Sequence, residues 1–540
     1  MKASDLFVEI LEKKWVKKIY WVPWEENLDL VDSIRKSWKI ELIITRNEQT
    51  AVFMAATYWR LTWEVWVAIA TLGPGATNMV TWVAYAQLWG FPVMVITGQK
   101  PIKKSKQWQF QIIDVVSMMK PITKFATSII SWNKIPYILN NAFRIAVSER
   151  PWAVAIELPE DIAGEEVENP NLEISDEKIR RPIIDEKSIL KLWQELEKAK
   201  TPIILIGAWA NRKRITKYLW EFIKKYNIPF FTSQMWKWVV REDLKEYLWT
   251  AALTTNDYIH DAIKKADLIL SVWYDPIEKP THLVWVWGTR NIHINFYEAN
   301  IDEVYNPYLE IIWDIWNTFW QLCEQNIDNS NWNFKEIYEI KEDYNKKIEE
   351  NILNEISNKN EIMWPRQLVN DVRNILNPED IVALDNWLYK VWFARNYKTF
   401  EPNTLLLDNA LATMWAWLSS GMEAKILNPE KNVVVVTWDW WLVMNLWDLE
   451  TAVRLKLDLT IVVLNNSSYW MIKWKQVWAN MPMWWLDFWN PDFVKLAESF
   501  WGKWYKVKNK NDFKNILEKT LNEKWLKIID LDFEYPVEIK

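Results

Sequence analysis

Oxygen-bearing side chains follow two apolar runs in the last third of the chain. The run VVVVT leads into WDWW, which contains Asp439, and 24 residues separate Trp440 from the pair Asn465 and Asn466 after the next apolar run. Asp and Asn taken singly are common turn residues. Placed together after two buried strands, a carboxylate and a carboxamide can bind a hard cation, and backbone N–H groups of the turn can cradle a diphosphate. The spacing therefore predicts a cation and diphosphate site.

Tryptophan stands in these turns where glycine is expected. The chain has 43 Trp and 9 Gly among 540 residues, whereas an ordinary protein contains about 7% Gly. Strand-to-helix turns often need positive φ or close backbone approach, which Gly supplies without steric cost. The segments at 20–27, 55–69, 148–159 and 433–445 each become ordinary turns if Trp is replaced by Gly. We therefore hypothesise that most of the Trp positions are encoded by UGA codons and that the organism translates UGA as Gly.

The alternative is a truly Trp-rich, non-enzymatic binding protein, such as a glycan-binding or interfacial protein. Such proteins carry Trp on exposed faces at strand or helix spacing, whereas here the Trp positions follow turns. A few tryptophans are expected to be genuine, because Trp392 and Trp474 lie in helical or aromatic contexts where Gly would be out of place. UGG codons at Trp59, Trp438 and Trp440 would contradict the hypothesis.

The elements that position the predicted site alternate between short β-branched runs and helical segments. This alternation predicts an α/β chain of three successive doubly wound parallel-sheet domains. We expect an N-terminal domain at residues 1–165, a central domain at 185–330 and a C-terminal domain at 360–540, with a polar linker after the first.

The charge and composition of the chain argue against several other classes of protein. A net charge of −6 without a basic cluster argues against a nucleic-acid partner. The single cysteine, Cys323, excludes an internal disulfide and fits the cytoplasm. Three histidines in the middle third do not suggest a catalytic triad or a His-rich metal site. The N-terminal segment lacks the uninterrupted apolar run of a signal peptide or membrane span, so no membrane association is expected.

If Trp438 and Trp440 are read as Gly, the chain contains the motif GDG, followed after 24 residues by NN. This motif resembles the thiamine diphosphate signature of the acetolactate synthase and pyruvate oxidase family. The segment TRNEQTAVFMAATYWR is similar to the family's segment around its catalytic glutamate, which implies that Glu48 is the catalytic residue. In the family this carboxylate hydrogen-bonds the cofactor's aminopyrimidine. The resemblance extends over essentially the whole chain, including TLGPGATN at 71–78 and YWMIKWKQ at 469–476. It implies three thiamine diphosphate-enzyme domains.

The resemblance also implies roles for further residues. The cofactor would contact residues from both terminal domains: Pro23, Glu48, Met414, Trp438, Asp439, Trp440, Met444, Asn466 and Met471. Mg²⁺ would be held by Asp439, Asn466 and Ser468. The substrate pocket would include Gly73, Phe110, Gln111 and Trp474, although Phe110 and Gln111 could equally serve packing and a turn hydrogen bond.

This sequence departs from the family pattern at several positions. Asn47 replaces the histidine that commonly precedes the glutamate, and Ile112 stands where a Glu often follows Phe-Gln. The segment SVWYDPIEKP at 271–280 resembles catabolic, FAD-free acetolactate synthases, so FAD is not expected. A literal indole at position 438 or 440 would leave no room for the diphosphate.

The activity implied by the resemblance is that of an acetolactate synthase. Such an enzyme decarboxylates pyruvate on thiamine diphosphate and joins the two-carbon unit to a second 2-keto acid, giving 2-acetolactate and CO2. A pyruvate oxidase or a 2-keto acid decarboxylase remains the alternative, because these enzymes share the cofactor residues. Since the family holds its cofactor between subunits, a homodimer or homotetramer is implied. The sequence leaves two points open: whether pyruvate or 2-ketobutyrate is the preferred acceptor, and whether a regulatory subunit binds.

Overall fold

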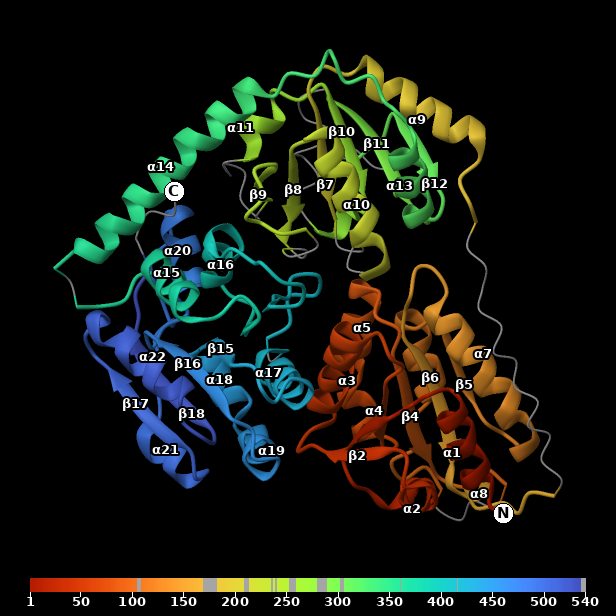
Figure 1. Cartoon of the computed structure of the whole chain (residues 1–540). Helices are drawn as coiled ribbons and strands as arrows, with labels where there is room; N and C mark the ends of the chain where they lie inside the picture. The colour runs from red at the N-terminus through yellow and green to blue at the C-terminus, as the bar shows by residue number, and fades with distance from the viewer. Residues whose placement is uncertain are drawn as a thin grey trace. The chain divides into compact units, whose positions relative to one another are not determined.

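Three six-stranded parallel sheets organise the chain, as the computed structural model shows (Figure 1). It describes residues 1–103, 108–168, 182–207, 213–234, 237, 240–251, 259–278, 289–301, 305–359, 361–414 and 416–535. The predicted α/β class with three parallel sheets is confirmed. Residues 169–181 of the predicted linker, residues 279–280 of the segment compared with FAD-free enzymes and Trp415 lie outside the described residues.

The first sheet has the strand order β2-β1-β3-β4-β6-β5. Its apolar strands are covered on one face by a core that α1, α2, α7 and α8 share, as expected of a parallel sheet enclosed by helices. Its strands are β1 (Lys18–Trp21), β2 (Glu41–Ile44), β3 (Val67–Ala70), β4 (Met94–Gln99), β5 (Phe125–Ser128) and β6 (Val154–Pro159). Its helices are α1 (Ala3–Lys13), α2 (Leu28–Ser37), α3 (Glu48–Thr62), α4 (Pro74–Asn78), α5 (Val80–Trp89), α6 (Val115–Met119), α7 (Ile135–Val147) and α8 (Glu160–Ala163).

The central sheet has the order β12-β11-β10-β7-β8-β9. One of its faces packs on α11 and the start of α14 through a single buried cluster. Its strands are β7 (Pro202–Ile206), β8 (Phe230–Ser233), β9 (Tyr247–Ala251), β10 (Leu268–Val272), β11 (Arg290–Asn295) and β12 (Leu309–Ile312). The helices are α9 (Glu186–Lys198), α10 (Lys213–Tyr226), α11 (Ile259–Ile263), α13 (Ile315–Glu324) and the long α14 (Lys335–Ser357).

The C-terminal sheet has the order β14-β13-β15-β16-β18-β17. The valine run of β15 is fully buried, since a central parallel strand is covered on both faces. Its strands are β13 (Ile381–Leu384), β14 (Leu405–Leu406), β15 (Val433–Trp438), β16 (Leu459–Asn465), β17 (Lys503–Val507) and β18 (Lys527–Asp532). The helices are α15 (Pro365–Ile375), α16 (Tyr389–Asn396), α17 (Ala416–Leu427), α18 (Asp439–Met444), α19 (Leu449–Arg454), α20 (Trp470–Trp478), α21 (Phe493–Ser499) and α22 (Phe513–Leu521).

The chain divides into two compact units that do not coincide with the three sheets. Unit 1 comprises Met1–Arg180, Trp415–Glu430 and Asn445–Leu457, and unit 2 comprises the remainder. Helices α17 and α19 thus belong to the unit of the first sheet, where α17 packs along α3.

Tryptophan occupies backbone conformations that favour glycine. Eight of the fifteen described non-glycine residues with positive φ are Trp: Trp15, Trp38, Trp63, Trp108, Trp273, Trp485, Trp501 and Trp525. Trp38 and Trp63 end α2 and α3 in the left-handed conformation, with φ of 55° and 64°. Gly90 ends α5 in the same way at 61°. A bulky residue at such φ is a steric outlier, whereas Gly adopts it freely.

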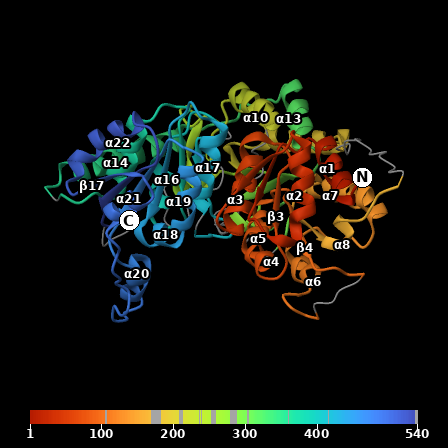
Figure 2. The same cartoon turned by 90° about the horizontal axis from the view of Figure 1, so that it is seen from below.

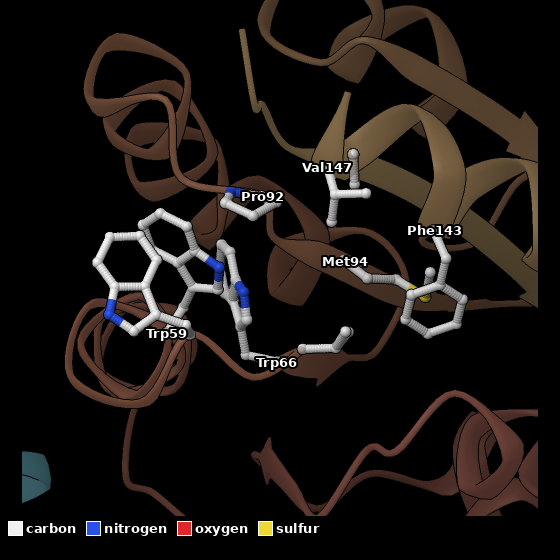
Figure 3. Close-up of a pocket in the computed structure, with 9 residues that line it drawn as sticks. Trp59, Trp66, Pro92, Met94, Phe143 and Val147 are labelled. Atoms are coloured by element: carbon white, nitrogen blue, oxygen red, sulfur yellow. The ribbon is translucent and has the colours of Figure 1, made fainter. Parts of the chain in front are cut away.

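Indoles in the first sheet's domain border a void, and one of them lacks a hydrogen-bond acceptor among the described residues. Figure 3 shows Trp59 and Trp66 beside a small cavity lined also by Pro92 and Met94. Its volume of about 40 Å³ is enough for roughly one water molecule. The buried indole nitrogen of Trp66 has no hydrogen-bond acceptor among the described residues, although buried Trp N–H groups usually find one.

Helix α20 stands out from the body of unit 2 (Figure 2). The segment from this helix to residue 489 exposes apolar side chains, among them Ile472, Val477, Met481 and Met483 at 42–59%. Within the described ranges, no helix combines the length and apolar character that crossing a bilayer requires.

Candidate active site

Glu48 is the first residue of α3 in unit 1, and three residues separate it from the end of the edge strand β2. The side chain of Asn47 accepts a hydrogen bond from the Gln49 N–H at 2.8 Å and so caps the helix. Asn47, which departs from the family's histidine, therefore has a local structural role. Glu48 is 8% exposed, and its Oε2 accepts a hydrogen bond from Asn78 Nδ2 at 2.9 Å. The carboxylate is thus shielded from water and fixed through one oxygen.

Asp448 anchors the segment that carries Glu48. This carboxylate is 1% exposed and accepts hydrogen bonds from the Arg46 N–H at 3.0 Å and from the Thr50 hydroxyl. Glu450 adds an ion pair with Arg46 at 2.8 Å. Burial raises the pKa of Asp448, and the Thr50 and Arg46 hydrogen bonds oppose that rise. Sequence reasoning missed this contact because about 400 positions separate its partners.

The other predicted residues of unit 1 follow neighbouring strands. Pro23 lies exposed after β1, and Gly73 follows β3, so both share a sheet edge with Glu48, where ligands of α/β proteins bind. Gly73 has φ of 49°, and a Cβ there would meet the Gln111 carbonyl oxygen at 2.7 Å. Gly73 and Gln111 are therefore in contact, and the neighbouring Phe110 is 65% exposed.

Gly75 makes a second close approach at this edge. A Cβ on Gly75 would lie 2.7 Å from Thr71 Cγ2 and 3.3 Å from Glu48 Oε1. Any larger residue would therefore press on Thr71 and on an oxygen of the Glu48 carboxylate. The contact places the TLGPGATN segment against Glu48, with Asn78 at one end of α4 as its hydrogen-bond donor.

Asp439 lies in unit 2 at the end of β15 and begins α18. Its side chain is fully buried, and Oδ2 accepts hydrogen bonds from the Asn466 and Ser467 N–H groups at 3.0 and 2.7 Å. Asn490 Nδ2 donates to the same oxygen at 2.9 Å. Burial raises the pKa of Asp439 to about 6, against the effect of these donors. Asn490 is a residue that sequence reasoning did not identify.

Asn466 and Ser468 complete the predicted cation site after β16. Because β15 and β16 are adjacent and parallel, the carboxyl end of β16 brings Asn466 beside Asp439, and Ser468 follows two residues later. Asn466 Oδ1 accepts a hydrogen bond from the Ser468 N–H at 3.3 Å, and Ser468 Oγ accepts one from Lys473 Nζ at 3.2 Å. Carboxylate, carboxamide and serine oxygens are the hard donors that Mg²⁺ prefers. The donor set therefore fits magnesium.

The indoles around the same turn do not fit a diphosphate. Trp387, Trp438 and Trp441 pack with ring centroids 4.4–5.4 Å apart beside Asp439. The ring of Trp440 lies 4.9 Å from Phe488 and 5.4 Å from Tyr469. The buried indole nitrogens of Trp438 and Trp441 find no acceptor among the described residues. The literal side chains therefore crowd the backbone that a phosphate would have to approach.

The remaining predicted residues also lie in unit 2. Met444 ends α18, Met471 and Trp474 are half-buried in α20, and Met414 is 42% exposed. The loop before Met414 is held by Lys390, a buried lysine whose Nζ donates to the Asp408 carbonyl at 3.0 Å. Burial lowers the pKa of Lys390 to about 8. The predicted residues thus form two groups, one in each unit.

Comparison with protein families identifies all three sheet domains. Residues 1–118 match the N-terminal TPP binding domain of thiamine pyrophosphate enzymes, 189–322 match their central domain, and 388–531 match their C-terminal TPP binding domain. With these three domains in order along most of its length, the chain belongs to the thiamine pyrophosphate enzymes.

Curated relatives over the full length narrow the class further. An acetolactate synthase of Bacillus subtilis (strain 168) is 28% identical over 99% of this chain and 93% of its own length. A catabolic acetolactate synthase of Raoultella terrigena is 26% identical, over 92% of this chain and 89% of its own. An acetolactate synthase large subunit of Cyanidium caldarium is 28% identical, over 97% and 92%. The chain is therefore similar over its full length to acetolactate synthases, and its three domains are those of an enzyme family rather than of a Trp-rich binding protein.

Proposed function

We propose that the protein is an acetolactate synthase that takes pyruvate as its donor substrate. Its full-length similarity to enzymes of that name supports this function. The single geometric observation that carries it is the buried Asp439 carboxylate at the end of β15, which accepts hydrogen bonds from the Asn466 and Ser467 N–H groups directly after the neighbouring β16. The reaction consumes two pyruvate molecules and yields one 2-acetolactate and one CO2.

Thiamine diphosphate would supply an acidic thiazolium carbon and an electron sink for decarboxylation. The chain's own residues have distinct tasks. Glu48 would hold and return a proton at Oε1, while Oε2 stays bonded to Asn78. Asp439 and Asn466 would hold Mg²⁺ through oxygen. The substrate would be bordered by the contact between Gly73 and Gln111 and by the neighbouring Phe110.

Product analysis tests the proposed activity against its alternatives. Pyruvate alone, with Mg²⁺ and thiamine diphosphate, is expected to give 2-acetolactate as the main product. Acetaldehyde would indicate a 2-keto acid decarboxylase, and acetyl phosphate formed with phosphate and oxygen would indicate a pyruvate oxidase. Either result would overturn the proposal. Competition between pyruvate and 2-ketobutyrate as acceptor then measures the acceptor preference.

We also propose that most tryptophans of the printed sequence are glycines in the native protein, encoded by UGA. Eight described Trp at positive φ support this reading, since two of them end helices as Gly90 does. The crowded turn beside Asp439 supports it independently, because Gly at 438, 440 and 441 would free the backbone N–H groups for phosphate.

Trp392 and Trp474 are expected to remain tryptophan. Trp392 is 3% exposed inside α16, with its ring 5.8 Å from that of Tyr535. Peptide mass mapping of the protein purified from its own organism tests both expectations. Glycine masses are expected at 38, 63, 438 and 440 and tryptophan masses at 392 and 474. Tryptophan at the first four positions would overturn the recoding proposal.

We propose a homodimer or homotetramer of the catabolic, FAD-free type, located in the cytoplasm. The exposed Ile472, Val477, Met481 and Met483 support self-association, since apolar surface of this kind commonly marks an interface. The catabolic relative supports the type, and a single half-buried Cys323 suits a reducing compartment. Sedimentation of the holoenzyme, its visible absorption spectrum and its activity without a second subunit test these points. A monomer or a bound flavin would contradict them.

A further inference from the structure

A second cavity in unit 2 lies apart from every residue assigned above. It has a volume of about 440 Å³ and is bordered by the β8–β9 segment, α14, α15 and the end of α16. This size falls within the range of small-molecule sites, which is about 300–1,000 Å³. Neither Asp439 nor Asn466 contributes to its lining.

Positive charge dominates the wall of this cavity. Five cationic side chains line it: Lys237, Lys341, Arg373, Arg395 and Lys398. Three acids also line it, but Glu242 is bound by Lys237 at 2.9 Å and Asp243 by Arg241 at 2.8 Å. Glu349 is the third acid. With Lys237 and Glu242 cancelling each other, four cations remain in the wall against Glu349 and the paired Asp243, so the wall keeps an excess of positive charge.

Neutral acceptors hold two of these cations in place. Arg373 donates to the Tyr397 hydroxyl at 2.8 Å and to the carbonyls of Leu376 and Asn377 at 2.5 and 3.0 Å. Lys341 Nζ donates to the Lys245 carbonyl at 2.9 Å. Such partners fix a cation's position without cancelling its charge. The two groups are therefore preorganised for an anion, which reduces the entropy lost on binding.

The ammonium groups are close enough to repel one another. Burial, reinforced by the Lys398 ammonium, lowers the pKa of Lys341 to about 8. Lys398 also acts in the same direction on the buried Lys237, whose pKa is lowered mainly by burial. Like charges gathered at one wall are stabilised when an anion binds between them.

The rest of the lining suits an organic ligand with hydrogen-bonding groups. Asn345, Asn370 and Asn374 offer amide donors and acceptors, and Phe400 offers an aromatic ring. The Arg373 guanidinium already lies 5.2 Å from the centre of that ring. Cations next to amides and an aromatic side chain match a molecule that carries both phosphate and a flat ring. We propose that this cavity binds a phosphorylated small molecule of nucleotide size.

Calorimetric titration of the holoenzyme tests this proposal without relying on activity. In the chain with glycine at the UGA-encoded positions, the thiamine site is first saturated with thiamine diphosphate and Mg²⁺, and ADP and inorganic pyrophosphate are then titrated separately. We expect ADP to bind with a Kd of about 1 mM or tighter, and more tightly than pyrophosphate. Absence of binding by both probes, or equal binding of the two, would overturn the proposal.

Matched variants locate the binding. The double variant Lys341→Gln/Lys398→Gln is expected to weaken ADP binding by about tenfold or more, since charge-assisted hydrogen bonds are lost. The control variant Lys346→Gln removes an exposed lysine of α14, the helix that carries Lys341. Lys346 does not line the cavity, so the Kd for ADP should stay unchanged. If the double variant does not fold, the single variant Lys398→Gln, at an exposed position, replaces it in the ADP titration. ADP binding that is unaffected by Lys398→Gln and the double variant would refute the site.

Discussion

Glu48 combines burial with a single fixed oxygen, which is the arrangement expected of a carboxylate that exchanges a proton with a bound ring. Glu48→Gln keeps the shape and the Asn78 contact but cannot accept a proton. In the chain with glycine at the UGA-encoded positions, we expect this variant's turnover to fall by about 10²- to 10⁴-fold while Mg²⁺-dependent thiamine diphosphate binding stays within a few-fold. Steady-state kinetics and calorimetry measure the two quantities. Glu25→Gln, at a largely exposed side chain, is the control, and retained turnover in Glu48→Gln would refute the assignment.

Asp439 is the ionisable member of the predicted cation site. Asp439→Asn replaces an anionic oxygen ligand by a neutral one and places an NH2 group among the N–H donors of Asn466 and Ser467. We expect the affinity for thiamine diphosphate in the presence of Mg²⁺ to fall by at least about tenfold, because metal affinity depends strongly on ligand charge. Unchanged magnesium dependence in this variant would show that the cation is held elsewhere.

Glu423 is a buried acid that the proposed chemistry does not use. It is fully buried in α17, and its Oε1 lies 3.9 Å from Lys18 Nζ. Burial raises the pKa of Glu423 to about 7, although Lys18 and Tyr20 oppose the rise. The folded state therefore binds a proton more tightly than the unfolded state, so stability is lost as the pH rises from about 4.5 to 7.

Glu423→Gln should remove that pH dependence. The neutral amide does not have to ionise, so we expect the variant to be more stable than the parent at pH 8 by roughly 1–3 kcal/mol. At pH 4.5 the difference should vanish. Thermal unfolding at both pH values measures it. A variant that is less stable at pH 8 would mean that the Lys18 ion pair outweighs the cost of burying the charge.

At the scale of elements, Trp38 and Trp63 are helix ends rather than core residues. Trp38 is 89% exposed with φ of 55°. In the literal chain, Trp38→Gly should raise the free energy of unfolding by about 1 kcal/mol, because it relieves the left-handed strain and loses little packing. Trp59→Gly, inside α3, is the matched control and should destabilise instead. Denaturant titration compares them, and a destabilising Trp38→Gly would contradict the backbone argument.

The same scale shows what the sequence could predict. Apolar runs before Asp439 and Asn466 predicted two buried strands of a parallel sheet, and β15 and β16 are such strands, which the structure also shows to be paired with each other. The spacing gave no sign of Asn490, which reaches Asp439 Oδ2 from a later loop. Nor did it indicate the anchoring of Thr50 by Asp448, because a contact between residues about 400 positions apart depends on the packing of α19 with the first sheet's unit. The local sequence pattern predicted the oxygen-bearing residues that follow β15 and β16, but not the residues that hydrogen-bond to Asp439 and Thr50 from distant parts of the chain.

At the scale of the whole molecule, the excess of tryptophan bears directly on whether the proposed thiamine diphosphate site can be occupied. The oxygen donors at Asp439, Asn466 and Ser468 suit magnesium, whereas the indoles at 438, 440 and 441 obstruct the adjoining turn. Glycine at these positions would remove the obstruction and would agree with the cofactor of the thiamine pyrophosphate enzymes, the family of this chain. Function and decoding are therefore testable in a single comparison of two proteins.

The most direct measurement compares the printed chain with the chain in which UGA-encoded positions are glycine, both assayed with pyruvate, Mg²⁺ and thiamine diphosphate. We expect the glycine chain to form 2-acetolactate with one CO2 per molecule, strictly dependent on thiamine diphosphate, and the tryptophan chain to form none. Acetolactate formation by the tryptophan chain, or its absence from a folded glycine chain, would contradict the combined proposal of acetolactate synthesis and glycine decoding.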